Sequence, residues 1–193
     1  MNTLSSYKSW WKSLSPQWRQ AFSLSVLQKQ DEPTNEDLES LKNLQVLRIT
    51  GPTAPYPNCK FELNELSGIA DLNKLEILIV THHTIENIEV LAQLPSLKAI
   101  FLLNNHIKSL KGIESLFNLE QLYVQCNQIS SIKEIEQLLN LREFYIHDNK
   151  IVSLEGLTEA HSDKLRKLVC QPNELLKQKE IIHAERELGI ICR

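Results

Sequence analysis

The chain has 193 residues, of which 42% are hydrophobic and 23% charged, and its formal net charge at pH 7 is -3. This composition is that of an ordered globular protein and excludes the low-hydrophobicity, high-charge class of disordered chains. A slightly negative chain provides no concentrated basic field, so we expect no nucleic-acid partner.

The cysteines and the N-terminal sequence bear on cofactors and compartment. Cys59, Cys126, Cys170 and Cys192 lie tens of residues apart, without a Cys-x-x-Cys or a Cys/His pair at metal-ligand spacing, so we expect no metal site and no cofactor. The N-terminus lacks the apolar stretch of a signal peptide, and no window reaches the about 18 apolar residues of a membrane span. We therefore expect a cytoplasmic protein with reduced thiols and no membrane span.

Residues 1–40 are expected to form a helical N-terminal cap. Ser15–Pro16 predicts the start of a helix whose apolar residues share one face, namely Trp18, Phe22 and Val26. Residues 7–14 have a similar periodicity, and the T-x-x-D sequence at 34–37 predicts a capping box at the start of another short helix. The tryptophans and lysines of this stretch are also compatible with an interfacial membrane helix, which stays open as an alternative.

A repeated motif occupies residues 41–173. It reads L-P-S-L-K-A-I-F-L-L-N-N-H-I from Leu94 and L-F-N-L-E-Q-L-Y-V-Q-C-N-Q-I from Leu116, and the copies from Leu72 to Leu138 start 22 residues apart. Further copies near Leu41 and Leu165 bring the number to six. A period of this length indicates stacked coils, each too small to bury its apolar faces alone.

Each copy predicts one short strand of a parallel sheet. Leu122 and Val124 point inward and Tyr123 outward, because side chains alternate along a strand. Pairs such as Ile107-x-x-Leu110 are expected to close the core from the convex side. The amides that follow the strands are expected to form a structural asparagine ladder that satisfies the backbone of the turns, with Asn105, Asn127, Asn149 and Asn173 as its members.

Two places depart from the repeat. His83 stands where the other copies have asparagine, and we interpret it as a turn histidine that replaces part of the amide hydrogen bonding, with a ligand or pH sensor as the alternative. The spacing from Leu44 to Leu75 is 31 residues, nine more than the period. The surplus T-G-P-T-A-P-Y-P-N-C-K at 50–60 predicts a projecting loop, which is either part of a binding site or a tolerated insertion.

Residues 174–193 are expected to form a C-terminal capping helix. The sequence N-E-L-L-K-Q-K-E-I-I-H-A-E-R-E-L-G is amphipathic and ends at Gly189. Its apolar residues are expected to seal the last strand, namely Leu175, Leu176, Ile181, Ile182 and Leu188. Caps and repeats would then form one continuous domain, since a solenoid exposes its core at both ends.

The repeat resembles the leucine-rich repeat family, with its L-x-x-L-x-L-x-x-N-x-I consensus, over roughly residues 38–175. Its length is similar to the repeats of phosphatase regulators and bacterial internalins, and S-P-Q-W-R-Q-A-F ahead of the repeats resembles free-standing bacterial members. The resemblance implies an α/β fold: a solenoid of about six repeats, shaped as a horseshoe or right-handed superhelix, with a concave parallel sheet and helical N- and C-terminal caps. It also implies a bacterial interaction protein, and no particular ligand.

The outward side chains of the sheet are the expected binding surface. Ile79, Phe101, Tyr123 and Tyr145 are four successive large residues of one row, and aromatic residues at such positions are typical binding anchors. Alternatively, they stack into a stabilising ladder. The residues expected to bind a protein or peptide on the concave face are Arg48, Ile79, Phe101, Leu103, Tyr123, Gln125, Glu143, Tyr145, His147 and Lys167.

These patterns favour a non-catalytic protein–protein interaction module. The alternative is a regulatory subunit that controls a partner enzyme such as a phosphatase, and both a monomer and a homo-oligomer are compatible with the sequence. Cys126 and His147–Asp148 could form a Cys/His dyad on adjacent repeats, but a strand-end surface offers no enclosed pocket. We therefore expect no enzyme.

Overall fold

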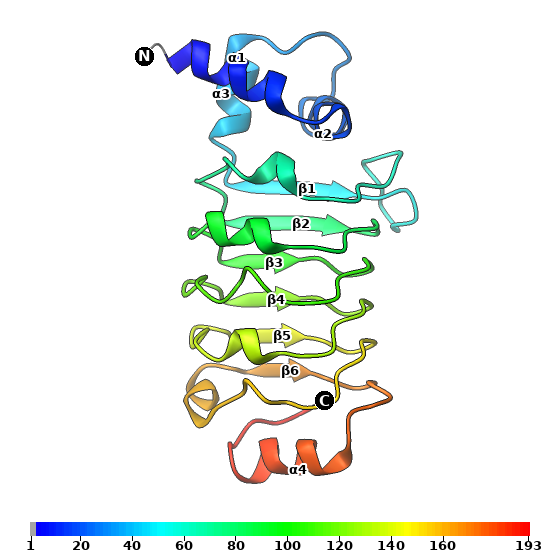
Figure 1. Ribbon diagram of the computed structural model, residues 1–193, viewed down its shortest axis with the longest axis vertical. Helices are drawn as coiled ribbons and strands as arrows, with labels where there is room; N and C mark the ends of the chain where they lie inside the picture. The colour runs from blue at the N-terminus through cyan, green and yellow to red at the C-terminus, as the bar shows by residue number, and fades with distance from the viewer. Residues whose placement is uncertain (1–2) are drawn as a thin grey trace.

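The computed structural model describes residues 3–193 as a stack of coils closed by helices at both ends (Figure 1). Residues 1 and 2 of the expected N-terminal cap lie outside the described residues. Six parallel strands form one sheet in chain order, which confirms the prediction of an α/β solenoid with one strand per repeat. The strands are β1 (Val46–Thr50), β2 (Ile77–Thr81), β3 (Ala99–Phe101), β4 (Gln121–Tyr123), β5 (Glu143–Tyr145) and β6 (Lys167–Val169).

Strand register follows the sequence period. Leu122 of β4 pairs with Ile100 on one side and Phe144 on the other, each 22 residues away. Paired residues of parallel strands point to the same side of a sheet, so the period places every inward side chain in a continuous column. The innermost column consists of Leu47, Leu78, Ile100, Leu122, Phe144 and Leu168, all buried.

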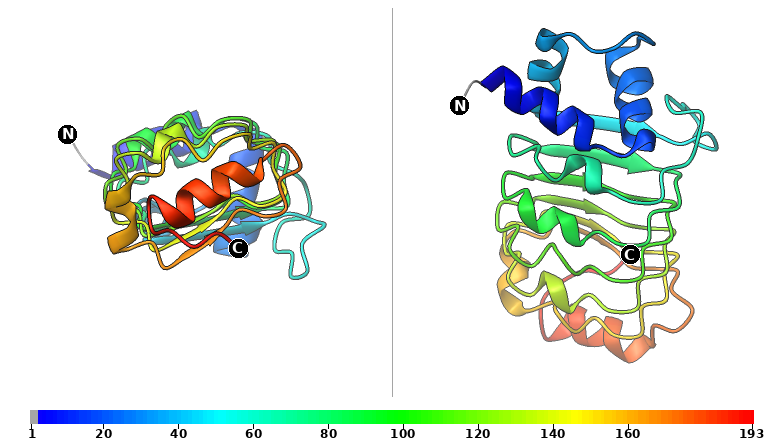
Figure 2. Two further views of the ribbon diagram at one scale, coloured as in Figure 1. Left: turned by 90° about the horizontal axis from the view of Figure 1, so that it is seen from below. Right: turned by 45° about the horizontal axis from the view of Figure 1, so that its top comes forward.

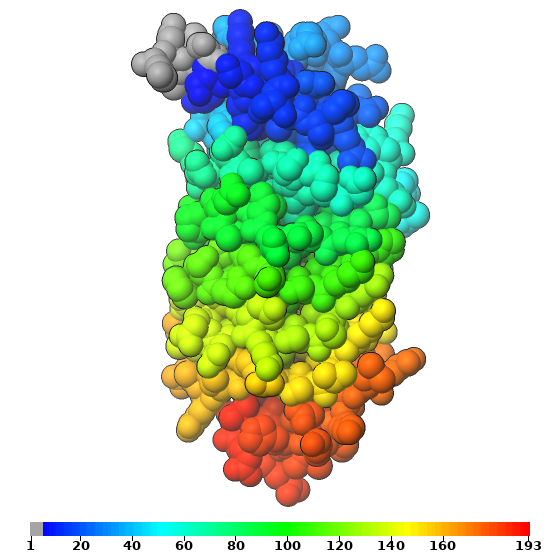
Figure 3. All heavy atoms as spheres, in the orientation of Figure 1, coloured from blue at the N-terminus to red at the C-terminus, as the bar shows by residue number. Residues whose placement is uncertain are grey.

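The convex side is made of turns and short 3₁₀ helices: η2 (Ser67–Ile69), η3 (Glu89–Gln93), η4 (Lys133–Ile135) and η5 (Glu159–Asp163). Buried residues recur there at every third position, as in the series through η4: Ile129, Ile132, Ile135, Leu138 and Leu141. A spacing of three matches the 3.0 residues per turn of a 3₁₀ helix and keeps one face inward. Successive coils therefore lie as flat layers, visible as bands in the space-filling view (Figure 3).

The N-terminal helices cover the first coil. They are α1 (Thr3–Ser13), α2 (Pro16–Ala21), the π-helix η1 (Phe22–Leu27) and α3 (Asn35–Lys42). The Ser15 side chain accepts from the Trp18 N–H at 3.3 Å, and the capping box between Thr34 and Asp37 is present, as both sequence signals predict. Trp10, Trp11, Trp18 and Phe22 are buried, so their rings are occupied by the core rather than available to a lipid surface. Within residues 3–193 every helix is too short or too polar to span a bilayer.

The C-terminal helix is shorter than the sequence pattern suggests. Helix α4 covers Gln178–Arg186, and the predicted start near residue 174 is wrong because the Leu176 N–H donates to the Asn173 carbonyl at 3.1 Å and forms a turn first. Leu175 and Ile182 are exposed, so they do not seal the last strand, whereas Ile181 is buried. Viewed along the stack, α4 lies across the last coil (Figure 2), after which Cys192 forms a parallel bridge with Leu168 of β6.

Candidate functional site

The outward-pointing side chains of β1–β6, with the residue two places beyond each of β3, β4 and β5, form what we call the outer sheet face. Strand register brings Arg48, Ile79, Phe101, Tyr123 and Tyr145 into one row across the strands. Glu143 and Lys167 pair in the preceding row. The residues two places beyond the central row are Leu103, Gln125 and His147. All ten residues expected to bind a partner therefore lie on one surface of the sheet.

The aromatic residues of the central row stack on one another. The ring centroids of Phe101 and Tyr123 are 4.7 Å apart with planes at 33°, and those of Tyr123 and Tyr145 are 4.2 Å apart at 15°. Lys167 Nζ lies 5.0 Å from the Tyr145 ring centroid, within range of a cation–π interaction. The rings are half-buried, so stacking fixes their orientation while leaving part of each ring in contact with solvent.

Tyr123 is also held by its hydroxyl group. The hydroxyl donates a hydrogen bond to Glu143 Oε2 on the neighbouring strand. Burial, together with this bond to a carboxylate, raises the pKa of Tyr123 well above its ordinary value. The hydroxyl therefore stays protonated, and one carboxylate oxygen of Glu143 is engaged within the face.

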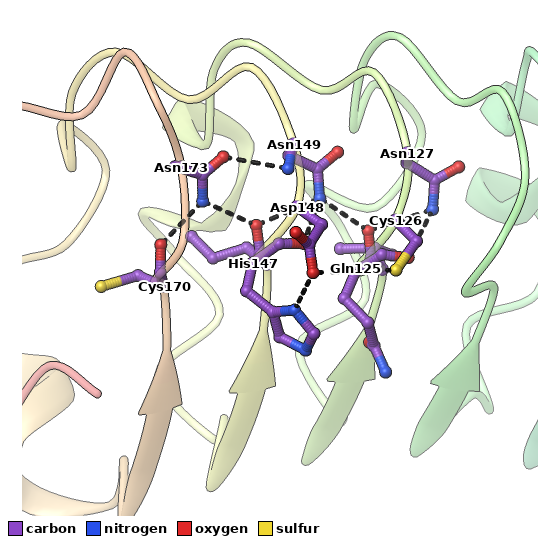
Figure 4. Close-up of polar contacts among 10 residues, drawn as sticks. Gln125, Cys126, Asn127, His147, Asp148, Asn149, Cys170 and Asn173 are labelled. Atoms are coloured by element: carbon purple, nitrogen blue, oxygen red, sulfur yellow. Dashed lines mark hydrogen bonds and ion pairs between the residues drawn. The ribbon is translucent and has the colours of Figure 1, made fainter.

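The Cys/His dyad considered from the sequence, Cys126 with His147, lies at the strand ends. There both side chains contact Asp148 (Figure 4). His147 Nδ1 lies 2.7 Å from Asp148 Oδ2, and the Cys126 thiol is directed to that same carboxylate at 4.0 Å. Burial, and then the nearby carboxylate, raise the pKa of Cys126, so the thiol stays protonated. Since the thiolate is the nucleophile, Cys126 is poorly suited to covalent chemistry.

The asparagines after the strands bind successive coils together (Figure 4). Asn149 Nδ2 donates to the Val124 carbonyl at 2.9 Å and the Ile146 carbonyl at 3.1 Å, and its Oδ1 accepts from the Ile129 N–H at 2.9 Å. Each amide thus satisfies backbone groups of its own turn and of the preceding coil. Asn105, Asn127 and Asn173 donate to the same two kinds of carbonyl and accept from the preceding coil in the same way, and Asn173 Oδ1 also accepts from the Asn149 N–H at 3.1 Å.

His83 occupies the equivalent position in the second coil. Its Nδ1 accepts from the Leu63 N–H at 3.1 Å and its Nε2 faces the Ile49 carbonyl at 3.3 Å. Burial lowers the pKa of His83 to about 4, so the ring is neutral at physiological pH and can donate from Nε2. An imidazole has one N–H in this state, so it reproduces one of the two amide donations.

The loop after β1 is pinned to that strand. Asn58 Oδ1 accepts from the Thr50 N–H at 2.7 Å, and Asn58 Nδ2 donates to the Arg48 carbonyl at 2.8 Å. Arg48 Nη2 donates to the Tyr56 carbonyl at 2.8 Å, so its guanidinium supports the loop. The Tyr56 side chain is 81% exposed. Sequence reasoning missed Asn58, although an Asn within a proline-rich insertion is a usable signal for side-chain capping of backbone.

Residues 3–193 contain no group of three or more His, Cys, Asp or Glu side chains arranged to hold a metal ion. The outer sheet face presents aromatic, aliphatic and hydrogen-bonding groups.

Known proteins share the motif and the fold. Residues 117–159 match the sequence family of leucine-rich repeats, and no curated protein matches the chain. An internalin of Listeria monocytogenes has a similar structure, with 21% identity over 75% of this chain and 39% of that chain and a TM-score of 0.63. A Leptospira interrogans leucine-rich repeat protein gives 22% identity, 78% and 42% coverage and a TM-score of 0.58.

A plant protein also has a similar structure. The peptide hormone receptor RGFR1, in complex with RGF2, gives 20% identity, covering 67% of this chain and 21% of that chain, with a TM-score of 0.53. The present chain spans about two fifths of the length of the two bacterial structures. Together, the 22-residue period, the family match within the repeats and the shared coil architecture show that the chain carries leucine-rich repeats and has the leucine-rich repeat fold.

Proposed function

We propose that the protein is a non-catalytic interaction module that binds a protein or peptide on its outer sheet face. The leucine-rich repeat fold is generally a protein–protein interaction module, and function within it depends on the residues of the site. The observation that carries the proposal is the stack of Phe101, Tyr123 and Tyr145, which is partly exposed at the middle of the sheet.

The stack has the physical properties of a binding anchor. Tyrosine and phenylalanine contribute large contact areas, and such residues dominate binding energies at many interfaces. Mutual stacking and the hydrogen bond from Tyr123 to Glu143 restrict ring rotation before a partner arrives. Restriction in the free protein reduces the entropy lost on binding.

The proposal includes a bacterial source and a cytoplasmic compartment. All four cysteines are free thiols, which suits a reducing compartment. Two bacterial leucine-rich repeat structures are similar in fold, which supports a bacterial source.

Alanine substitution at Phe101 and Tyr123 tests the proposed surface. We expect the double variant to lose at least about tenfold in partner affinity, because anchor truncations commonly cost more than 1 kcal/mol. The measurement is affinity capture from the source cells with mass spectrometry, followed by titration of the recovered partner. Circular dichroism and thermal unfolding would check that the variant is folded.

Phe117→Ala is the matched control, since Phe117 is an exposed phenylalanine outside the sheet. It should capture the partner as the unsubstituted protein does. Equal capture by the Phe101/Tyr123 double variant would contradict the proposal.

The alternative of a regulatory subunit uses the same surface and differs in what is recovered. If the partner is an enzyme, such as a phosphatase, its turnover should change on addition of this protein and return to the basal value with the double variant. A partner without an activity that responds would leave the interaction module as the function.

A further inference from the structure

The outer sheet face is chemically divided along the stack. Over β1–β3 six of the nine outward side chains are apolar, and we call these the apolar half: Val46, Ile77, Ile79, Ala99, Phe101 and Leu103. The other three are the buried Thr50 and Thr81 and the exposed Arg48, whose guanidinium donates to the Tyr56 carbonyl. Over β4–β6 the rows on either side of the central one are polar, and this polar half consists of Gln121, Gln125, Glu143, His147 and Lys167. A ligand that covers the whole face must therefore itself change character along its length.

The loop that carries Tyr56 borders the apolar half. Figure 2 shows the loop projecting from the stack beyond the ends of the strands. Besides the Arg48 bond, the Thr50 hydroxyl donates to the Tyr56 carbonyl at 2.9 Å, and the Cys59 N–H donates to the Thr50 carbonyl at 3.0 Å. The chain thus holds an exposed aromatic ring on a hydrogen-bonded arm beside β1. Such an arm loses little further freedom when a partner binds against it.

In and beside the polar half, the acidic side chains have partners within the protein, whereas two basic side chains have no ion-pair partner among residues 3–193. Glu143 accepts from Tyr123, and Asp148 contacts His147, so both acids have partners within the protein. At the position just before each strand, Glu76 pairs with Lys98 at 2.8 Å and Glu120 with Arg142 at 3.1 Å.

Arg166 continues this series one strand further, and Lys167 follows it on β6. Neither has an ion-pair partner among residues 3–193, and both side chains are exposed. Lys167 instead lies over the Tyr145 ring. The unbalanced charge at the β6 end of the face is therefore positive and complementary to a carboxylate.

We propose that the outer sheet face binds one acidic–apolar peptide segment, whose apolar side chains lie on the apolar half beside Tyr56 and whose carboxylate meets Arg166 and Lys167. The inference rests on the proposed function and adds the chemistry and direction of the ligand. From β2 to β6 there are four strand spacings, about 19 Å in total. This length corresponds to about six residues of extended chain or about thirteen of α-helix, so the spacing between apolar and acidic positions reports the bound conformation.

The two halves contribute differently to binding. Burial of apolar side chains over β1–β3 supplies most of the affinity, because it scales with the apolar area removed from water. The exposed cations contribute to association rate and orientation, and their effect decreases with salt. We therefore expect the acidic residue to decide which end of the peptide lies on β6.

Peptide selection on the intact protein tests the proposal. A displayed library of random 16-residue peptides would be selected at low salt on the unsubstituted protein and sequenced. We expect enrichment of peptides that contain at least two apolar residues (Leu, Ile, Phe or Met) and one acidic residue (Asp or Glu). The acidic residue should lie at a constant distance from the apolar ones, on either side of them. Changing that acid to lysine should weaken binding at least tenfold.

Charge reversal supplies the decisive comparison. Selection on the double variant Arg166→Glu/Lys167→Glu should enrich Lys or Arg at the position that was acidic, while the apolar positions stay the same. The matched control Lys150→Glu changes an exposed lysine outside the strands and should leave the selected pattern unchanged. Circular dichroism would confirm that both variants are folded.

The outcomes separate the inference from the proposed function. Peptides that require Phe101 and Tyr123 but lack the acidic–apolar pattern, or keep it after charge reversal, overturn the inference alone. An absence of enriched peptides also overturns the inference alone, because the proposed function is tested by partner capture. Peptides and a captured partner that bind the Phe101→Ala/Tyr123→Ala variant equally well overturn both.

Discussion

The two edges of the sheet are closed by different means. At β1 a side chain closes the edge, because the Asn58 amide pairs with the Thr50 N–H and the Arg48 carbonyl. At β6 the main chain does so: the Cys170 N–H donates to the Arg193 carbonyl at 2.8 Å, and the Arg193 N–H donates to the Leu168 carbonyl at 3.0 Å. An open strand edge can pair with the strands of other chains, and both arrangements prevent this by occupying the free backbone groups of the edge strand.

The helical caps beyond the two edges also differ, in the size of the side chains that they bury. At the N-terminal end Trp18 is fully buried, and a Cβ added to Gly68 would lie 2.1 Å from its ring. At the C-terminal end smaller side chains are buried, namely Ile181, Ala184 and Ile190. The N-terminal end therefore depends on a few large side chains, whereas the C-terminal end depends on main-chain pairing and distributed aliphatic contacts. We expect single substitutions to damage the first end more than the second.

Trp18→Ala should have the largest effect. Removal of a buried indole costs about 4 kcal/mol in free energy of unfolding, and the Nε1–H bond to the Glu65 carbonyl at 3.2 Å is lost as well. Denaturant unfolding measures the loss, and hydrogen exchange should show β1 and β2 losing protection before β5 and β6. A loss below about 1 kcal/mol would show that the aromatic residues are not the main support of this end.

Acid should weaken both ends through buried histidines. The pKa of His83 is lowered to about 4 by burial, and burial also lowers the pKa of His161, whose Nε2 faces the Ile135 carbonyl near the C-terminal end. The unfolded chain binds a proton near pH 6.5, so the stability from His83 is complete above pH 6.5 and is lost as pH falls to about 4. The contribution is on the order of 3 kcal/mol.

The variant His83→Asn separates the two contributions. It replaces the ring with the amide of the other coils and should flatten the dependence of unfolding free energy on pH between 6.5 and 4, leaving the part due to His161. Denaturant titrations at a series of pH values measure this slope. An unchanged slope would remove His83 as a cause of acid sensitivity.

Ile190→Ala should have a smaller effect than Trp18→Ala. Ile190 is 2% exposed, and truncation of a buried isoleucine costs about 2 kcal/mol or slightly more. The neighbouring Ile191 is 69% exposed, so Ile191→Ala is the matched control and should change the unfolding free energy by less than about 0.5 kcal/mol. Equal effects of the two substitutions would argue against a sealed C-terminal end.

Asn58→Ala should have the smallest effect on stability and a specific effect on association. The two amide bonds to β1 contribute about 1 kcal/mol each at most, and their loss uncovers the strand edge. Thermal unfolding should shift by a few degrees, and sedimentation velocity should show concentration-dependent self-association. Asn64→Ala, an exposed asparagine outside the strands, is the control and should sediment as the unsubstituted protein does.

Strand positions and register could be predicted from the sequence, because each repeat contributes one strand and the 22-residue period fixes which residues pair. Leu122, Ile100 and Phe144 are matched by spacing alone. The ends were less predictable. Asn58 closes an edge through contacts that depend on how an irregular loop folds back, and no period constrains that path. The pairing of Cys192 with Leu168 was missed because so short a segment has no alternating pattern to indicate a strand.

The candidate face was predictable to the same extent as the strands, since outward positions follow from the alternation of side chains. What could not be read from the sequence is how each side chain is used there. Arg48 is a predicted binding residue whose guanidinium also donates to the Tyr56 carbonyl of the loop. Glu143 is a predicted binding residue whose carboxylate also accepts from the Tyr123 hydroxyl. These choices depend on rotamers, which local composition leaves undetermined.

The pinned loop after β1 has a consequence for engineering. Gly51 must stay at its start, because a Cβ there would lie 1.7 Å from the His82 carbonyl oxygen, and Asn58 must stay at its end. Residues 52–57 between these fixed points make up an exchangeable cassette, whose bonds to β1 involve the main chain of residue 56 rather than its side chain. Randomising this cassette should alter ligand preference while the repeats keep their register, much as antibody scaffolds carry variable loops.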